Sequence, residues 1–407
     1  MNIQQIRRDF PILNKKVHNQ SLIYLDNAAT GQLPQPVVDA MQEHIFSANG
    51  NVHRGIHTLS ANSSSLYEQA RQTTADFLHA PSATNIVFTG STTDSIHLVA
   101  ASLERTLTPK DEILVSQMEH HSNFIPWQQI CRHTGAKLRI IPLTEAGELD
   151  ISLLESLFSP HTKFLTLSHC SNVTGIVTDL KQICTIAHAH QVPVLIDGAQ
   201  GCVHLTVDVQ DIDCDFYCFS GHKLMGPTGI GVLYGKTEAL EQLIPTRYGG
   251  GMVRTCSLTE SIWEDIPHRL EAGTPNYIAA TGLKAALDYR RLHNMNTLYS
   301  YETDLMNLLE DGLSTLSGIY ILGKTPNRTG CISFSAEGAH PFDIAAFLDQ
   351  MGIAVRSGHH CAMPLLRHFQ LEHAVRVSPS FFNTKEEIHF FLDSLEKVLH
   401  LLRKSSC

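Results

Sequence analysis

The chain has 407 residues, of which 43% are hydrophobic and 17% charged, and its formal net charge is −10. This length and composition favour a globular protein with a large core and room for two domains. The acidic balance argues against nucleic acid as a partner, and no apolar run reaches the ~20 residues of a membrane span. Residues 1–10 carry charges where a signal peptide would be apolar, so we expect a cytoplasmic protein without a membrane partner.

The first two-thirds of the chain alternate between β-prone and helix-prone segments. Helices are predicted at residues 34–46, 92–103 and 180–190, and Leu66, Ala70, Thr74 and Phe77 share one helical face. The alternation predicts an α/β fold with a mainly parallel sheet that helices cover on both faces. The predicted strands comprise residues 23–25, 85–89, 112–116, 137–142, 163–168, 192–196, 215–219 and 229–234.

The pattern changes after residue 249. Residues 249–275 have the composition of a long irregular loop, and a helix-rich stretch follows at 278–317. Short strands are predicted near 331–335 and 354–356, and a last helix at 385–404. We therefore predict three parts: an N-terminal segment (1–20) that packs with the small domain, a large domain (21–290) and a smaller α+β C-terminal domain (291–407).

The ten cysteines do not indicate a metal site or a disulfide scaffold. The sequence contains no CxxC pair, and ten cysteines are too few for a scaffold in a chain of this length. No metal is therefore expected. Most of the cysteines lie in apolar runs and are expected to be small buried side chains: Cys170, Cys184, Cys202, Cys214, Cys218 and Cys331.

Polar residues follow five of the predicted strands. Ligands of an open parallel sheet bind beyond the carboxyl ends of its strands, so these residues are expected to share one edge and to form a functional site. In chain order they are Ser91, Thr92 and Thr93, then Glu119, His120 and Asn123, then Ser171 and Asn172, then Asp197 and Gln200, and finally Ser220, His222 and Lys223.

Two of these residues indicate a pyridoxal phosphate (PLP) site. Lys223 offers an amine that is able to form a Schiff base, and Asp197 a carboxylate that is able to pair with a protonated pyridine nitrogen. Residues 91–93 open a helix, where free N–H groups suit a phosphate, although Ser and Thr are also ordinary N-caps. The alternatives are a solvated lysine for Lys223 and a helix cap or turn for Asp197. His120 could stack on a ring or relay a proton, or be a core histidine.

The C-terminal part contains a candidate nucleophile. Cys361 lies in a loop rich in Gly and His, and Arg356 precedes it by five residues. Nearby positive charge lowers the pKa of a thiol and raises its thiolate fraction. The alternative is a metal site made of residues 359–361. Arg376, among apolar neighbours, suits a substrate carboxylate or a buried salt bridge.

These segments together resemble the group II cysteine desulfurases, the selenocysteine lyase-like branch of the class-V aminotransferase family. The resemblance covers nearly the whole chain, and it implies the PLP-dependent transferase fold of type I. One departure is Gly90-Ser91, where the family usually has Arg-Gly before two threonines. The matching motifs are Tyr24-Leu25-Asp26-Asn27-Ala28-Ala29-Thr30, Asn51-Val52-His53-Arg54-Gly55, Ser220-Gly221-His222-Lys223 and Arg356-Ser357-Gly358-His359-His360-Cys361.

The resemblance also implies a role for each site residue. Lys223 carries PLP and moves protons, His120 lies on the ring face, and Cys361 takes the substrate sulfur. The other implied cofactor-binding residues are Thr92, Thr93, Asp197, Gln200, Ser220 and His222, with Thr274 from a second subunit. The implied substrate-binding residues are Ala28, His53, Asn172, Arg356 and Arg376.

The activity that the resemblance implies is conversion of L-cysteine to L-alanine by a homodimer. Sulfane sulfur would pass through a persulfide on Cys361 to an acceptor protein, for example in iron–sulfur cluster assembly. Three alternatives stay open. The chain could act on L-selenocysteine as a lyase, act on cysteine sulfinate as a desulfinase, or be a non-catalytic sulfur carrier with the same fold.

Overall fold

The structure is a computed structural model, and it describes residues 2–53 and 55–405. Arg54, part of the predicted substrate motif, lies outside the described residues. A seven-stranded sheet forms the centre, with the order β4-β10-β9-β8-β7-β5-β6. The strands are β4 (Ile86–Thr89), β5 (Glu112–Ser116), β6 (Lys137–Ile141), β7 (Thr162–Ser168), β8 (Val194–Asp197), β9 (Phe216–Ser220) and β10 (Gly231–Gly235).

Among the described strands of this sheet, β10 runs antiparallel to both of its neighbours, and the other pairings within the sheet are parallel. The prediction of a mainly parallel sheet is therefore confirmed. Both faces of the sheet are buried. Successive residues of a strand point to opposite faces, and on this sheet they belong to two different apolar clusters. On β8, Val194 and Ile196 belong to one apolar cluster, whereas Leu195 belongs to another.

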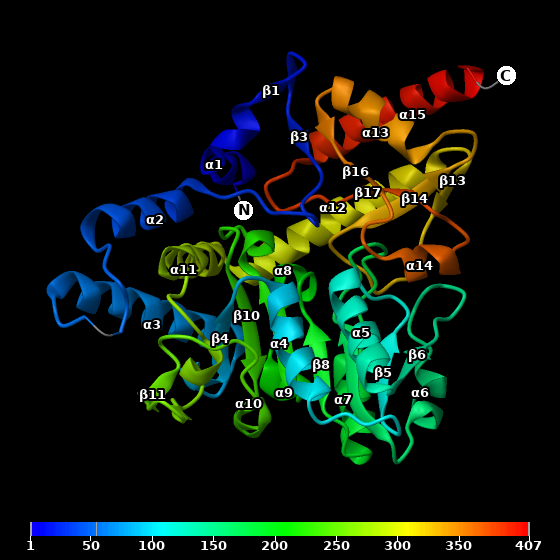
Figure 1. Cartoon of the computed structure of the whole chain (residues 1–407). Coiled ribbons are helices and arrows are strands. Elements are labelled where there is room, and N and C mark those ends of the chain that lie inside the picture. Colours follow the sequence, from blue (N-terminus) through cyan, green and yellow to red (C-terminus); the bar gives the residue numbers. More distant parts are fainter. Residues whose placement is uncertain (1, 54, 406–407) are drawn as a thin grey trace.

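Helices cover both faces of the sheet (Figure 1). α4 and α5 contribute Ile96 and Trp127 to the cluster on one face, and α3 and α7 contribute Tyr67 and Ile183 to the cluster on the other. None of the helices in the described part of the chain combines the length and hydrophobicity that a bilayer crossing requires. The α-helices between residues 35 and 292 are α2 (Gln35–Ser47), α3 (Thr58–Leu78), α4 (Thr92–Glu104), α5 (Ile125–Thr134), α6 (Ile151–Leu157), α7 (Leu180–Ala189), α8 (Gly201–His204), α9 (Val209–Ile212), α10 (Thr237–Gln242) and α11 (Tyr277–Leu292).

A second, antiparallel sheet lies in the C-terminal part, with the order β13-β14-β17-β16. Its core is a separate apolar cluster to which α12, α13 and α15 contribute Leu305, Ile344 and Phe391. Strands β13 and β17 were not predicted from the sequence. The elements are α12 (Met295–Thr315), β13 (Ile319–Ile321), β14 (Ile332–Ala336), α13 (Pro341–Gln350), β15 (Ile353–Ala354), β16 (Arg356–Gly358), α14 (Met363–His368), β17 (Ala374–Val377) and α15 (Lys385–Ser405).

The N-terminal segment lies against this C-terminal part, as Figure 1 shows for α1 (Ile3–Arg8) and β3 (Ile23–Tyr24). β3 pairs in parallel with β15, and Arg7 forms an ion pair with Glu387 at 2.7 Å. The ring of Phe10 packs on that of Phe382 with centroids 4.7 Å apart. These contacts support the predicted packing of residues 1–20; the domain boundaries themselves stay a prediction.

The predicted loop at 249–275 contains a hairpin, so that prediction was wrong in part. β11 (Val253–Cys256) pairs with β12 (Ser261–Trp263) across a turn held by Ser257. The hairpin is largely exposed, and Leu258 at its turn is fully exposed. Neither face of the hairpin is buried, so its sequence lacks the alternation of apolar and polar residues that marks a half-buried strand.

Candidate active site

A cavity of about 330 Å³ lies at the carboxyl ends of the parallel strands, where the strands meet the C-terminal part. The structure brings most of the predicted site residues into its wall. They are Ala28, Thr92, Thr93, His120, Asn172, Asp197, Gln200, Ser220, His222, Lys223, Arg356, Cys361 and Arg376.

Lys223 lies just beyond β9, in the single turn η4 (Gly221–Leu224). Its Nζ has no hydrogen bond or ion pair with any described residue, although Asp197 lies in the wall of the same cavity. Burial lowers the pKa of Lys223, and Asp197 opposes that effect in part. A larger fraction of the amine is therefore neutral at a given pH, which is the form that attacks a carbonyl carbon.

Asp197 ends β8 and is buried at the floor of the cavity. Its Oδ1 accepts a hydrogen bond from the Ala199 N–H at 2.9 Å, while Oδ2 has no partner among the described residues. Holding a carboxylate away from bulk water is costly, and a cationic N–H in the cavity would offset that cost. The residue therefore fits the protonated ring nitrogen of a pyridoxal cofactor.

The start of α4 forms another wall of the cavity. Ser91 is its N-cap, and its Oγ accepts from the Asp94 N–H at 3.1 Å. The Thr92 N–H and hydroxyl both contact the Ser220 Oγ at 2.7 Å. A Cβ on Gly231 would lie 2.4 Å from the backbone of Ser91, so glycine lets β10 pass close behind this turn. Backbone N–H groups and hydroxyls at the positive end of a helix suit a phosphate.

His120 lies on the loop after β5 and lines the cavity. Burial, followed by the charge of Lys223, lowers its pKa to about 3. The ring is therefore neutral near pH 7, and its Nδ1 accepts from the Ser122 N–H at 3.1 Å. A neutral flat ring in a cavity wall is able to stack on an aromatic cofactor.

The neighbouring Glu119 fixes the loop after β5 by hydrogen bonds. It is fully buried, and it accepts hydrogen bonds from the Asn123 amide at 2.6 Å and from the Ser168 N–H at 2.8 Å. The Ser116 and Ser168 hydroxyls are further donors. Glu119 therefore connects the carboxyl ends of β5 and β7 one residue before His120.

Glu119 should make stability depend on pH. Burial raises the pKa of Glu119 to about 7, so between about pH 5 and pH 7 the folded state keeps a proton that the unfolded state has lost. Its contribution to the unfolding free energy is therefore largest at pH 5 and is lost as the pH rises towards 8. We expect wild type to lose about 2 kcal/mol relative to Glu119→Gln over this range. Denaturant unfolding of wild type and Glu119→Gln at each pH measures this difference in unfolding free energy. Glu155→Gln is the control, because Glu155 is exposed on α6. If the unfolding free energies of wild type and Glu119→Gln changed equally with pH, the assigned effect of Glu119 would be disproved.

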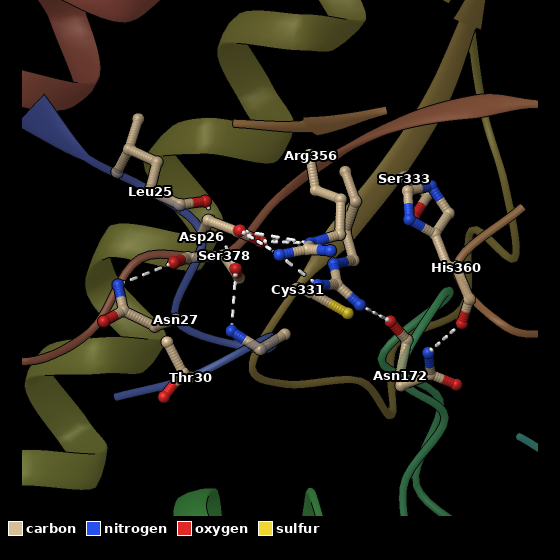
Figure 2. A network of polar contacts seen from close by, with 12 residues as sticks. Leu25, Asp26, Asn27, Thr30, Asn172, Cys331, Ser333, Arg356, His360 and Ser378 are labelled. Carbon is tan, nitrogen blue, oxygen red and sulfur yellow. Dashed lines mark hydrogen bonds and ion pairs between the residues drawn. The ribbon is translucent and has the colours of Figure 1, made fainter. Parts of the chain in front are cut away.

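Two guanidinium groups share one carboxylate at the opposite side of the cavity (Figure 2). Arg356 and Arg376 face each other across β16 and β17, and both contact Asp26. The Arg356 Nη2 lies 2.8 Å from the Asp26 Oδ2, and the Arg376 Nη2 lies 3.2 Å from its Oδ1. The Arg376 Nε is buried without a partner among the described residues. Two cations against one anion leave a net positive charge, which suits a carboxylate ligand.

The Cys361 loop is connected to the rest of the site by its backbone. The Cys361 carbonyl accepts from the His121 N–H at 2.6 Å, and the His360 carbonyl accepts from the Asn172 amide at 2.8 Å. His360 and Cys361 adopt left-handed φ angles of 51° and 55°. Such angles cost energy for non-glycine residues and persist where the surroundings fix them, often at functional sites.

The thiol of Cys361 is exposed, unlike most other described cysteines. The ring of His360 is buried and contacts the Ala374 carbonyl at 3.0 Å, so it points into the C-terminal part (Figure 2). His359 is used differently, because its Nδ1 accepts from the Cys361 N–H at 3.0 Å. The three side chains thus make separate contacts, and this geometry favours a thiol nucleophile over the alternative metal site.

Two predicted residues lie away from this cavity. His53 lies against Glu68, with its Nε2 3.1 Å from the Glu68 Oε1. Thr274 lines a second cavity of about 560 Å³, which Thr93 also borders. Their predicted roles towards the cofactor and the substrate are not visible within a single chain and stay predictions.

Asp26 and Glu119 are the residues whose roles the sequence did not reveal. Asp26 belongs to a motif that carries the resemblance, and its partners lie about 330 and 350 positions away in the sequence. The sequence placed Glu119 at the edge of the sheet because it follows a strand, and the structure shows that it is buried and accepts four hydrogen bonds.

Comparison with known proteins matches residues 23–391 to the family model "Aminotransferase class-V". A probable cysteine desulfurase of Halalkalibacterium halodurans is 44% identical over 98% of both chains. The chain belongs to the cysteine desulfurases of the class-V aminotransferase family. The crystal structure of the Escherichia coli cysteine desulfurase CsdA superposes with a TM-score of 0.91 at 40% identity, covering 98% of this chain and 99% of that one. The apo cysteine desulfurase of Thermococcus onnurineus NA1 superposes with a TM-score of 0.93 at 36% identity over 98% of both.

The cofactor of this family member is PLP, and the cavity fits it. An amine without a hydrogen-bond partner, the carboxylate of a buried aspartate that faces the cavity, and a helix N-terminus surround one space of suitable size. The predicted cofactor and the fold of PLP-dependent transferases of type I are thereby confirmed.

Proposed function

We propose that this protein is a PLP-dependent cysteine desulfurase, a sulfurtransferase that converts L-cysteine to L-alanine. The observation that carries the proposal is that the amine of Lys223 and the exposed thiol of Cys361 border the same cavity. Lys223 would hold PLP, which would supply an electron sink for negative charge that develops at the α-carbon of the substrate. The Cys361 thiolate attacks the substrate sulfur, and the bond from the β-carbon to sulfur breaks.

The balance of the reaction defines what the protein's own groups must do. L-Cysteine and the Cys361 thiol give L-alanine and a Cys361 persulfide, so protons have to reach the α- and β-carbons. Lys223 in the cavity wall would move them, because its lowered pKa brings its proton exchange closer to neutral pH. Arg356 and Arg376 would hold the substrate carboxylate, with Asn172 beside it.

A homodimer would account for the position of Thr274 outside the first cavity and for the exposed apolar side chains near α2. Thr274 lies in the second cavity rather than the first, where a partner's groups could meet it. Large apolar side chains are also exposed on α2 and the loop after it, among them Phe46 at 77% and Ile56 at 104%. Exposed apolar side chains in this number are typical of a surface that another chain covers.

The persulfide sulfur would pass to an acceptor protein in the cytoplasm, and iron–sulfur cluster assembly is one such use. The exposure of Cys361 supports direct transfer, because an acceptor thiol has to reach its outer sulfur.

The proposal is tested by product balance and substrate comparison. Purified protein with L-cysteine and a thiol acceptor should form alanine and sulfane sulfur in equal amounts. Comparing kcat/KM for L-cysteine, L-selenocysteine and cysteine sulfinate then separates the desulfurase from its two catalytic alternatives. Preference for either alternative substrate would change the assigned function, and failure to turn over any of them would favour a sulfur carrier.

Arg376→Lys should lower kcat/KM for L-cysteine by about 10²-fold, mainly through KM. Lysine keeps the charge but loses the two-pronged geometry that a buried carboxylate requires. Arg328→Lys is a matched control, since Arg328 is equally buried, at 3% side-chain exposure, but pairs with Glu310 outside the cavity. Steady-state kinetics of both variants give the comparison. An unchanged KM in Arg376→Lys would exclude the assigned role.

A further inference from the structure

A cluster of two imidazoles and a carboxylate lies apart from the PLP cavity. One ligand atom each from His53, Glu68 and His268 lies within 4.8 Å of the others. They come from three places in the chain: the loop before α3, α3 itself and the turn η5 (His268–Leu270). The imidazole rings of His53 and His268 are 5.1 Å apart at an interplanar angle of 72°. Among the described residues, no other group has this arrangement of donors.

The three donors need little movement to meet at one ion. Zinc binds His nitrogen and carboxylate oxygen at ~2.0–2.2 Å, so two donor atoms of one ion are separated by at most ~4.4 Å. The three donor atoms of the cluster already lie within 4.8 Å of one another. The His53 side chain is 35% exposed and that of Glu68 is 43% exposed, which leaves both free to adjust. The opening to solvent also provides a path for the ion and room for a water as a further ligand.

The electrostatic state of the cluster favours a cation. The Glu68 carboxylate faces only donors, the Arg71 Nε at 2.9 Å and the His53 ring at 3.1 Å, and these surroundings suit an anion. The ring nitrogens of His268 have no hydrogen bond with a described residue, so a lone pair of this ring is available to an ion. An ionised carboxylate and a neutral imidazole are the forms that bind metals.

A surrounding network already fixes the carboxylate ligand. The Arg71 Nε donates to the Glu68 Oε2 at 2.9 Å and the Arg71 Nη2 donates to Oε1 at 3.4 Å, while Oε1 also faces the His53 Nε2 at 3.1 Å. Arg71 is itself held by Glu271, at 2.6 Å and 2.9 Å. The two carboxylates outweigh the one guanidinium by a single negative charge. Outer contacts of this kind orient metal ligands and tune their affinity.

We propose that His53, Glu68 and His268 form a binding site for a divalent cation of the zinc type. The His53 Nε2 and the Glu68 Oε1 lie 3.1 Å apart in a hydrogen bond. The ion would replace this hydrogen bond, and its proton would leave to solvent or to the other nitrogen of the ring. The ligand set of two imidazoles and one carboxylate suits zinc, or cobalt as its spectroscopic substitute, better than calcium or magnesium.

The cluster could not be found from sequence. His53 and Glu68 are 15 positions apart, and His268 follows 200 positions later, so no ligand spacing is visible. His53 was instead assigned to the substrate by resemblance. The ion would fix His53 and η5 to α3 at the edge of the second cavity, which Glu271 also lines.

The test is equilibrium dialysis of the PLP-loaded protein against zinc chloride, after chelator treatment, with metal content measured per chain. His268→Gln and His53→Gln should each bind one zinc ion fewer than wild type, or bind it at least ~10-fold more weakly. His133→Gln is the matched control, because His133 also pairs with a glutamate, Glu104 at 2.9 Å, but has no third donor. Unchanged PLP absorbance and melting temperature show that each variant is folded.

Two results would overturn the proposal. One is equal zinc stoichiometry and affinity in wild type, His268→Gln and His53→Gln. The other is a loss in His133→Gln as large as in the two cluster variants, since binding would then be an unspecific property of surface histidines. Substitution with Co²⁺ gives a second readout: the visible bands of a four-coordinate ion should be present in wild type and in His133→Gln, and weaker in both cluster variants.

Discussion

Cys361→Ala should lose sulfur transfer by about 10³-fold or more while keeping its bound cofactor. The thiol is the only group of the cavity wall that combines exposure with the nucleophilicity to accept a substrate sulfur. Removing a nucleophile abolishes its covalent step and leaves only the residual rate of the remaining groups. The side chain makes none of the bonds that hold the loop, which come from the backbone of Cys361. The visible absorbance of PLP should therefore be unchanged, and alanine formation gives the rate.

The control is Cys256→Ala. Cys256 is the other exposed cysteine of the described residues, but it lies on the β11–β12 hairpin, outside the cavity wall. This variant should retain wild-type activity. If Cys361→Ala formed alanine at the wild-type rate, the substrate sulfur would have to leave by a route without Cys361, and the proposed mechanism would be wrong.

Lys223→Ala should lose both activity and covalent attachment of the cofactor. The amine is the only lysine in the cavity wall, and it has no described partner that could compete for it. We expect turnover to fall by about 10³-fold or more, because the variant loses the group that binds PLP and the group that moves protons. Borohydride reduction followed by peptide mass analysis should attach the cofactor to Lys223 in wild type and to no residue in the variant.

Lys236→Ala serves as control. Lys236 also follows a sheet strand, but it pairs with Asp213 at the opposite end of the sheet. It should keep both activity and attachment. If borohydride still fixed PLP to the Lys223→Ala protein at another lysine of the site, or if turnover persisted, the assignment of Lys223 would fail.

The fold and most of the site were predictable because they depend on local patterns. Continuous apolar runs mark buried parallel strands, and polar residues directly after those runs must lie at one edge of the sheet. This rule alone places Asp197 and Lys223 in one site, although they belong to different strands. His120 and Thr92 follow from the same rule.

The features that sequence could not show depend on contacts between distant segments. Asp26 joins the two arginines only because β16 and β17 place Arg356 opposite Arg376, and a β-bridge from Asp26 to Ser378 brings the N-terminal strand beside them. No local pattern encodes that arrangement. The exposed hairpin at 253–263 is a different case, since a strand without a buried face carries little hydrophobic signal.

The central claim is that the thiol at position 361 receives the substrate sulfur in the PLP cavity. It is tested most directly by stopping the enzyme with an alkylating agent during turnover of L-cysteine and measuring the mass of the peptide that contains Cys361. The account predicts that this peptide carries one additional sulfur atom, and that the peptide containing Cys256 does not. An unmodified Cys361 peptide from enzyme that is actively forming alanine would contradict it.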